Sequence, residues 1–172
     1  MAAANKSLSV DIYLDVERFQ NAVNKFDRAL LARKQIEVYV GTYVDCAVLK
    51  LYKRSWANPS LDPLTSPSRI FFSIWINPVG ERKLFYNIHA LKLRELIGYK
   101  IESRKFADAF RTSFKEFEHK WKNVSIKFGP LTLMQGSVNI EPDIFQQEVL
   151  GLSNNFLEIE HLVDNALARF KS

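Results

Sequence analysis

The chain has little of what marks several familiar classes of protein. One cysteine, Cys46, among 172 residues excludes an intramolecular disulfide framework and a zinc site built on several thiolates. Six glycines and six prolines are too few for a fibrous or low-complexity chain. No apolar run has the length of a membrane span, and none follows Met1 as a leader would. We therefore expect a cytoplasmic protein without a membrane partner.

Recognisable catalytic motifs are missing as well. The glycine-rich nucleotide-binding fingerprints and the Gly-x-Ser-x-Gly pattern of serine hydrolases do not occur. The histidines, His89, His119 and His161, lie far apart, and none lies near Cys46, so the tight spacing of a metal site is absent. We predict no metal and no cofactor, and structural or exposed roles for the histidines. Without a catalytic constellation, the sequence favours a non-enzymatic binding module, possible partners being another protein chain or a second copy.

What the chain does have is material for a core, since 47% of its residues are hydrophobic and 13% are aromatic. Its strand signals come in runs and do not alternate with helices, which is typical of an α+β fold. We predict a single α+β domain over 1–172, with a mainly antiparallel sheet of about five or six strands. An N-terminal, a middle and a long C-terminal helix should flank this sheet.

Three stripes of apolar residues at helical spacing predict those helices. The first lies within 15–34, where Asp15 is a suitable N-cap. The second, rich in phenylalanine, runs over 103–121. The third runs over 142–170, with a proline at its start.

Alternating and β-branched residues predict strands over 36–40, 43–52, 70–76, 83–88, 124–128 and 131–140. We expect Gly41-Thr42 to turn the chain between the first two. Both faces of 43–52 are largely apolar, which predicts a central strand covered on both sides. Turn residues after 70–76 predict a hairpin with 83–88, and the proline-rich segment 55–68 predicts a mobile loop.

The net charge of +5 is spread unevenly, with a basic segment at 81–128 and an acidic one after it. Within the middle helix, four basic residues and two acidic ones share a line opposite the aromatic stripe. The basic members could follow a phosphate backbone, which makes a nucleic-acid-binding protein the first alternative. Equally, the six could pair among themselves as a solvated face. The four basic residues are Arg104, Arg111, Lys115 and Lys122.

A second alternative is a metal-dependent nuclease around Glu81 and Lys83. A Glu-x-Lys pattern on a strand can supply a metal ligand and a lysine for the attacking water. The partner carboxylate that such a site needs on the preceding strand is absent from 70–77. The pattern alone is therefore a weak candidate for catalysis.

The C-terminal helix carries two leucines off its main stripe, Leu150 and Leu157. They are seven residues apart and share one line of the helix. A helix packed by one face would leave both in water. A second apolar seam of this kind predicts a contact with a protein partner, most simply a homodimer.

Overall fold

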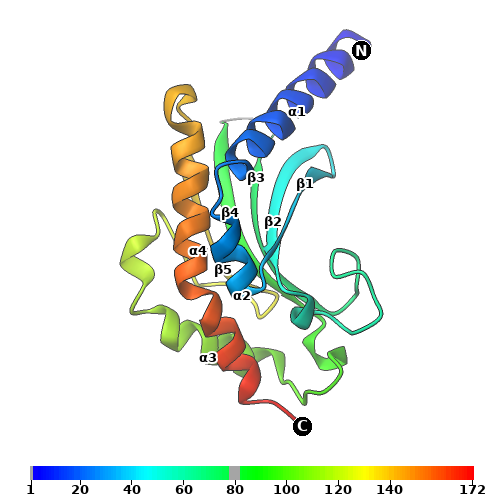
Figure 1. Ribbon diagram of the computed structural model, residues 1–172, viewed down its shortest axis with the longest axis vertical. Helices are drawn as coiled ribbons and strands as arrows, with labels where there is room; N and C mark the ends of the chain where they lie inside the picture. The colour runs from blue at the N-terminus through cyan, green and yellow to red at the C-terminus, as the bar shows by residue number, and fades with distance from the viewer. Residues whose placement is uncertain (1, 78–81) are drawn as a thin grey trace.

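The computed structural model describes residues 2–77 and 82–172, and Figure 1 shows their arrangement. Four helices and five strands follow one another with four short 3₁₀ turns, η1 to η4, between them. The elements are α1 (Ala2–Val23), α2 (Arg28–Lys34), β1 (Glu37–Tyr43), β2 (Cys46–Tyr52), β3 (Arg69–Ile76), β4 (Lys83–Leu91), α3 (Ser103–Phe114), β5 (Thr132–Asn139) and α4 (Phe145–Ala168). This confirms the predicted α+β fold, with five strands and a long C-terminal helix.

The sheet is a continuous antiparallel meander in the order β1-β2-β3-β4-β5. The turn predicted at Gly41-Thr42 is wrong, because these residues pair with Val48 and Ala47 inside the ladder. The chain reverses instead at 44–45, where both residues have positive φ angles of 45° and 60°. A two-residue hairpin turn needs this left-handed geometry.

One face of the sheet lies against the helices. In Figure 1, α1 and α4 lie in front of the sheet and α3 lies below them. Alternate side chains of β2 and β3, such as Leu49 and Ile74, point to this layer and are fully buried. Phe156 of α4 stacks on Phe72 of β3 with ring centroids 4.6 Å apart, and its edge meets Trp56. The main core therefore lies between this face and the helices.

Two helix boundaries differ from the prediction. The middle helix ends at Phe114 and does not continue to Trp121, although Trp121 is still buried through the turns that follow. The N-terminal helix passes through Asp15, which is therefore not an N-cap. A break follows α1, and Asp27 caps α2 by accepting a hydrogen bond from the backbone N–H of Leu30 at 3.0 Å.

The strands differ from the prediction in two further places. Residues 124–128 form no strand of their own, and within them only Ser125 bridges to Gln135 of β5. β2 lies inside the sheet as expected, but the helices cover only one of its faces. Its other face points into the hollow described next.

Candidate functional site

The second face of the sheet is built by the side chains that alternate with the core-facing ones. Strand register places Lys50 of β2 opposite Ser73 of β3, and Ser73 opposite Asn87 of β4. One row along, Phe71 lies opposite His89. A cavity of about 570 Å³ hollows this face between the β1–β2 hairpin and the strands β2, β3 and β4. We call it the open-face cavity.

Much of the lining of the open-face cavity is apolar. Val48 and Phe71 are buried side chains beneath it, and Trp75 stands beside them, stacked on Phe85 with ring centroids 5.5 Å apart. Tyr43, at the end of the β1–β2 hairpin, contributes a ring at the rim and is 65% exposed. A ligand in this cavity would therefore meet aromatic and aliphatic surface on several sides.

Two cations share this apolar cavity. The Nζ atom of Lys50 lies 4.6 Å from the centroid of the Phe71 ring, and the Cζ atom of Arg69 lies 5.3 Å from it. Both distances are within the range of cation–π attraction. Lys50 Nζ is also 5.4 Å from the centroid of Tyr43. The two positive charges are therefore gathered around one ring.

No carboxylate of the described residues pairs with either cation. The ion pairs found in residues 2–77 and 82–172 do not include Lys50 or Arg69, and no acidic side chain lines the cavity. One guanidinium nitrogen of Arg69 donates to the backbone oxygen of Ser66 at 2.6 Å. Its buried Nε has no hydrogen-bond partner in the described part of the chain. The cavity thus holds positive charge that these residues do not neutralise.

Burial and neighbouring charges shift the pKa values of Lys50, Arg69 and His89. Burial lowers the pKa of Lys50, and the positive charge of Arg69 lowers it further. Burial also lowers the pKa of Arg69, against a smaller opposing effect of Tyr43. For His89, burial lowers the pKa most; a hydrogen bond to the backbone of Leu131 opposes this, and the charges of Lys50 and Arg69 add to the lowering. His89 is therefore neutral at neutral pH.

A chain of polar contacts holds His89 in place. Ser73 Oγ donates to Asn87 Oδ1 at 2.6 Å. The Asn87 amide nitrogen then lies 2.9 Å from His89 Nε2 and 3.3 Å from Gln135 Oε1. Because that nitrogen is a donor, His89 Nε2 is the acceptor, and Nδ1 carries the proton toward the oxygen of Leu131 at 3.4 Å.

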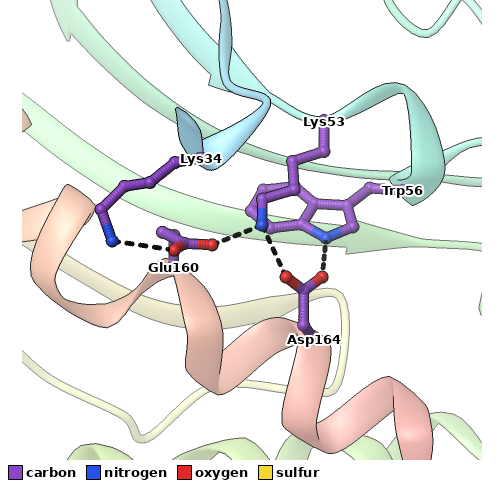
Figure 2. Close-up of polar contacts among 5 residues, drawn as sticks. All are labelled: Lys34, Lys53, Trp56, Glu160 and Asp164. Carbon is purple, nitrogen blue, oxygen red and sulfur yellow. Dashed lines mark hydrogen bonds and ion pairs between the residues drawn. The ribbon is translucent and has the colours of Figure 1, made fainter. Parts of the chain in front are cut away.

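A second charged cluster lies under α4 and behaves differently (Figure 2). Lys53 Nζ lies 2.5 Å from Glu160 Oε2 and 2.6 Å from Asp164 Oδ2. Lys34 Nζ reaches the other oxygen of Glu160 at 3.1 Å, and Trp56 Nε1 donates to Asp164 at 2.7 Å. Burial alone would lower the pKa of Lys53, but the two carboxylates raise it overall. This network joins α2, Lys53 directly after β2, and η1 (Arg54–Trp56) to α4, with each charge facing an opposite one.

The structure does not assemble the predicted basic row on one helix. Arg111 lies on α3 with its guanidinium turned toward the chain that precedes and opens β5. It donates to four backbone oxygens there, those of Phe128, Gly129, Thr132 and Leu133, at 2.9 to 3.0 Å. Burial lowers the pKa of Arg111. Its donors therefore serve the fold.

Of the other three members of the row, Arg104 stays beside Arg111, and the two line one small cavity with Asp108. Arg104 is exposed on α3, whereas Lys115 and Lys122 follow the end of that helix. Lys122 pairs with Glu148 of α4 at 3.0 Å. These four residues therefore do not lie along one helix.

None of the remaining candidates among the described residues lines the cavity. Lys83 opens β4 opposite Asn139, and Glu81 lies outside the described residues. Leu157, which was expected to stand in water, is 7% exposed and belongs to the core, and Leu150 is half-buried. Leu157 is therefore engaged within its own chain.

No protein-family model, no curated protein and no solved structure matches this chain. Within residues 2–77 and 82–172, no three histidine, cysteine or acidic side chains gather as metal ligands. No helix in this described part is long and apolar enough to cross a membrane. The open-face cavity is accordingly the feature from which a function can be argued.

Sequence reasoning missed Lys50 and Arg69 and treated His89 as structural or exposed. A local signal for Lys50 exists. Side chains of alternate strand residues point to the same face, so Lys50 follows the apolar Cys46 and Val48 on one face of 43–52. A charged residue in such an apolar row must find a partner or a ligand. Arg69 carries no comparable local signal, because it stands at the start of its strand, after a loop.

Proposed function

We propose that this protein is a non-enzymatic binding module, and that its open-face cavity takes a small organic anion with an apolar or aromatic body. The observation that carries the proposal is the pair Lys50 and Arg69, placed around Phe71 in an apolar cavity without a carboxylate partner among the described residues. The anionic group would lie at the two cations, and the body would lie over Val48 and Trp75.

The free-energy cost of removing water from the two cations supports this proposal. Partial removal of water from a charged group is costly unless an opposite charge takes the place of water. Lys53, only three residues after Lys50, has two carboxylates at 2.5 and 2.6 Å. Lys50 has aromatic rings and no such partner. A bound carboxylate or phosphate would supply the missing opposite charge, with Arg69 able to bind it in bidentate fashion.

The size of the cavity also favours a small molecule. A volume of about 570 Å³ falls within the range of small-ligand pockets. Single-stranded nucleic acid is also bound by aromatic residues on sheets, but such platforms offer open rings to successive bases. Here Phe71 is 7% exposed, and Trp75 and Phe85 stack on each other. We therefore favour a single small ligand over a strand of nucleotides.

The other expectations from the sequence stay predictions. A nucleic-acid site on 81–128 gains no support from Arg111, whose donors are engaged within the fold. A homodimer through Leu150 and Leu157 gains none from Leu157, which is buried in the core. A nuclease around Glu81 and Lys83 has no further observation in its favour.

Calorimetric titration with naphthoate tests the proposal, with naphthalenemethanol as the neutral ligand of similar shape. We expect the acid to bind and the alcohol to bind weakly or not at all. Lys50→Met and Arg69→Met should each lower the affinity for naphthoate by about tenfold to a hundredfold, which corresponds to the loss of one charge-assisted hydrogen bond. Lys100→Met, which removes an exposed lysine that does not line the cavity, is the matched control.

Equal binding of acid and alcohol, or equal loss in the control variant, would show that the cations of the cavity do not select the ligand. Titration with a single-stranded oligonucleotide in the same assay tests the alternative that the protein binds nucleic acid. If the oligonucleotide binds, and Lys50→Met and Arg69→Met abolish that binding while naphthoate gives no signal, the small-anion proposal is wrong.

A further inference from the structure

Besides the phenol of Tyr43 at the rim, four side chains that carry nucleophilic atoms line the open-face cavity. They are the amine of Lys50, the thiol of Cys46, the hydroxyl of Ser73 and the imidazole of His89. Their surroundings differ enough to decide which of them is available to react. A reactive group here would act on the same ligand that the proposed function places in the cavity.

Three of the four are engaged or deactivated. Ser73 donates its hydroxyl proton to Asn87 at 2.6 Å, and His89 has Asn87 at one nitrogen and a backbone oxygen near the other. Burial raises the pKa of the Cys46 thiol, and the negative charge of Asp45 raises it further. Since the thiolate is the nucleophile, this rise in pKa makes Cys46 a poorer nucleophile than an ordinary thiol.

Lys50 differs in having no carboxylate to hold its proton. Its amine faces the rings of Tyr43 and Phe71 and the positive charge of Arg69. Burial and that charge both lower the pKa of Lys50. These are the two conditions, desolvation and a neighbouring cation, that activate lysines for condensation with carbonyl groups.

We propose that Lys50 condenses with the carbonyl group of an α-keto acid bound in the open-face cavity, with the carboxylate of that acid at Arg69. The proposal rests on the proposed function, since it names the class of organic anion. Arg69, Phe71 and Ser73 follow one another on the same face of β3, and Lys50 lies opposite Ser73. A carboxylate at Arg69 thus brings an adjacent carbonyl toward Lys50, and an apolar side chain would lie over Val48 and Trp75.

The step needs no oxidant or reductant. The neutral Nζ attacks the carbonyl carbon and forms the C–N bond, and the former carbonyl oxygen takes the proton that the nitrogen loses. The hydroxyl of the resulting carbinolamine then leaves as the nitrogen lone pair forms the C=N bond, and the remaining N–H proton joins this hydroxyl as water. The product is an imine between Lys50 and the acid, and the condensation reverses when water returns. Lys50 would in this way bind its ligand covalently and reversibly, without converting it into another product.

Trapping with cyanoborohydride tests the inference. The full-length protein is incubated with phenylpyruvate and cyanoborohydride, and the sites of modification are mapped by peptide mass spectrometry. Reduction of the imine adds the mass of the acid less one oxygen atom. We expect labelling at Lys50 to exceed that at any other lysine by about tenfold or more, because an amine with a lowered pKa is more often the free base.

Two variants and one unreactive acid separate the inference from the proposed function. Lys50→Arg cannot form the imine and should give no trapped product, whereas the unmodified protein should bind hydrocinnamate, which has the carboxylate but no carbonyl group to react. Lys100→Arg, at an exposed lysine that does not line the cavity, should trap as the unmodified protein does. The mapping on the unmodified protein needs no variant, so the test stands even if Lys50→Arg folds poorly.

The outcomes are distinct. Labelling confined to Lys50, together with hydrocinnamate binding, supports the inference. If hydrocinnamate binds but the label spreads over exposed lysines, or is unchanged in Lys50→Arg, Lys50 is not the reactive amine and the anion site stands. If neither hydrocinnamate nor naphthoate binds, both proposals are wrong.

Discussion

Replacing Lys53 with methionine tests whether the network under α4 stabilises the fold. The side chain of Lys53 is 9% exposed, and its ammonium lies between Glu160 and Asp164 (Figure 2). The variant leaves the carboxylate of Glu160, itself 6% exposed, with Lys34 as its remaining cation. Removing one partner of a buried pair costs about 3–5 kcal/mol. Because Asp164 is 41% exposed and Lys34 remains, we expect about 3 kcal/mol, the lower end of that range.

Thermal and urea unfolding, followed by circular dichroism, measure this loss. For a chain of this size, about 3 kcal/mol corresponds to a melting temperature lower by about 6–12 °C. Replacing Lys53 and Glu160 together by methionine should destabilise less than Lys53→Met alone, since no buried charge is left unpaired. Lys105→Met, in an exposed pair with Glu102, is the control and should change stability by no more than about 0.5 kcal/mol.

The direction of the pKa shift gives a further check on the same network. The folded-state pKa of Lys53 is raised, so its stabilising contribution is present below the ordinary lysine pKa. It is lost as pH rises through the raised value. The stability difference between the original protein and Lys53→Met should therefore shrink in strong alkali. A Lys53→Met variant as stable as the Lys105→Met control at neutral pH would refute the reasoning.

Three other outcomes are expected. Phe110→Ala should cost about 3–5 kcal/mol in urea unfolding, because the ring is fully buried against Phe114; an unchanged midpoint would mean that α3 is not a core helix. Arg111→Lys should cost about 2–3 kcal/mol in the same assay, since the three donors of an ammonium cannot serve all four backbone oxygens that the guanidinium binds. A stability equal to that of the original protein would contradict this role. Naphthoate affinity should fall as the pH rises, at a pH below the ordinary pKa of lysine, because the pKa of Lys50 is lowered. In Lys50→Arg this fall should disappear. The other titratable groups that line the cavity are Arg69, Tyr43, Cys46 and His89.

Periodicity located the helices because each of them buries one stripe of side chains. It misplaced the end of α3, since Phe117 and Trp121 keep the helical spacing while the chain leaves the helix after Phe114. The capping preference of aspartate also led to the wrong assignment of Asp15 as an N-cap. Asp15 is in fact a buried residue within α1, paired at 2.7 Å with Arg82, and nothing local to Asp15 predicts a partner so far along the chain.

The open-face cavity could be predicted only in part. Alternation along 43–52 correctly indicated apolar side chains on both faces of that strand. It did not predict that helices would cover one face only. The meeting of Lys50, Arg69 and His89 depends on the pairing of three strands. Strand register is set by the whole sheet and its turns, so a single stretch of sequence does not contain it.

A crystal structure of the protein with bromonaphthoate tests the central claim most directly, because the bromine atom is located by its anomalous signal. We predict one site in the open-face cavity. Its carboxylate should lie within hydrogen-bond distance of Lys50 Nζ or the Arg69 guanidinium, and its bromine should lie on the side of Val48 and Trp75. A bromine ordered only elsewhere on the molecule, or a carboxylate turned away from both cations, would contradict the account.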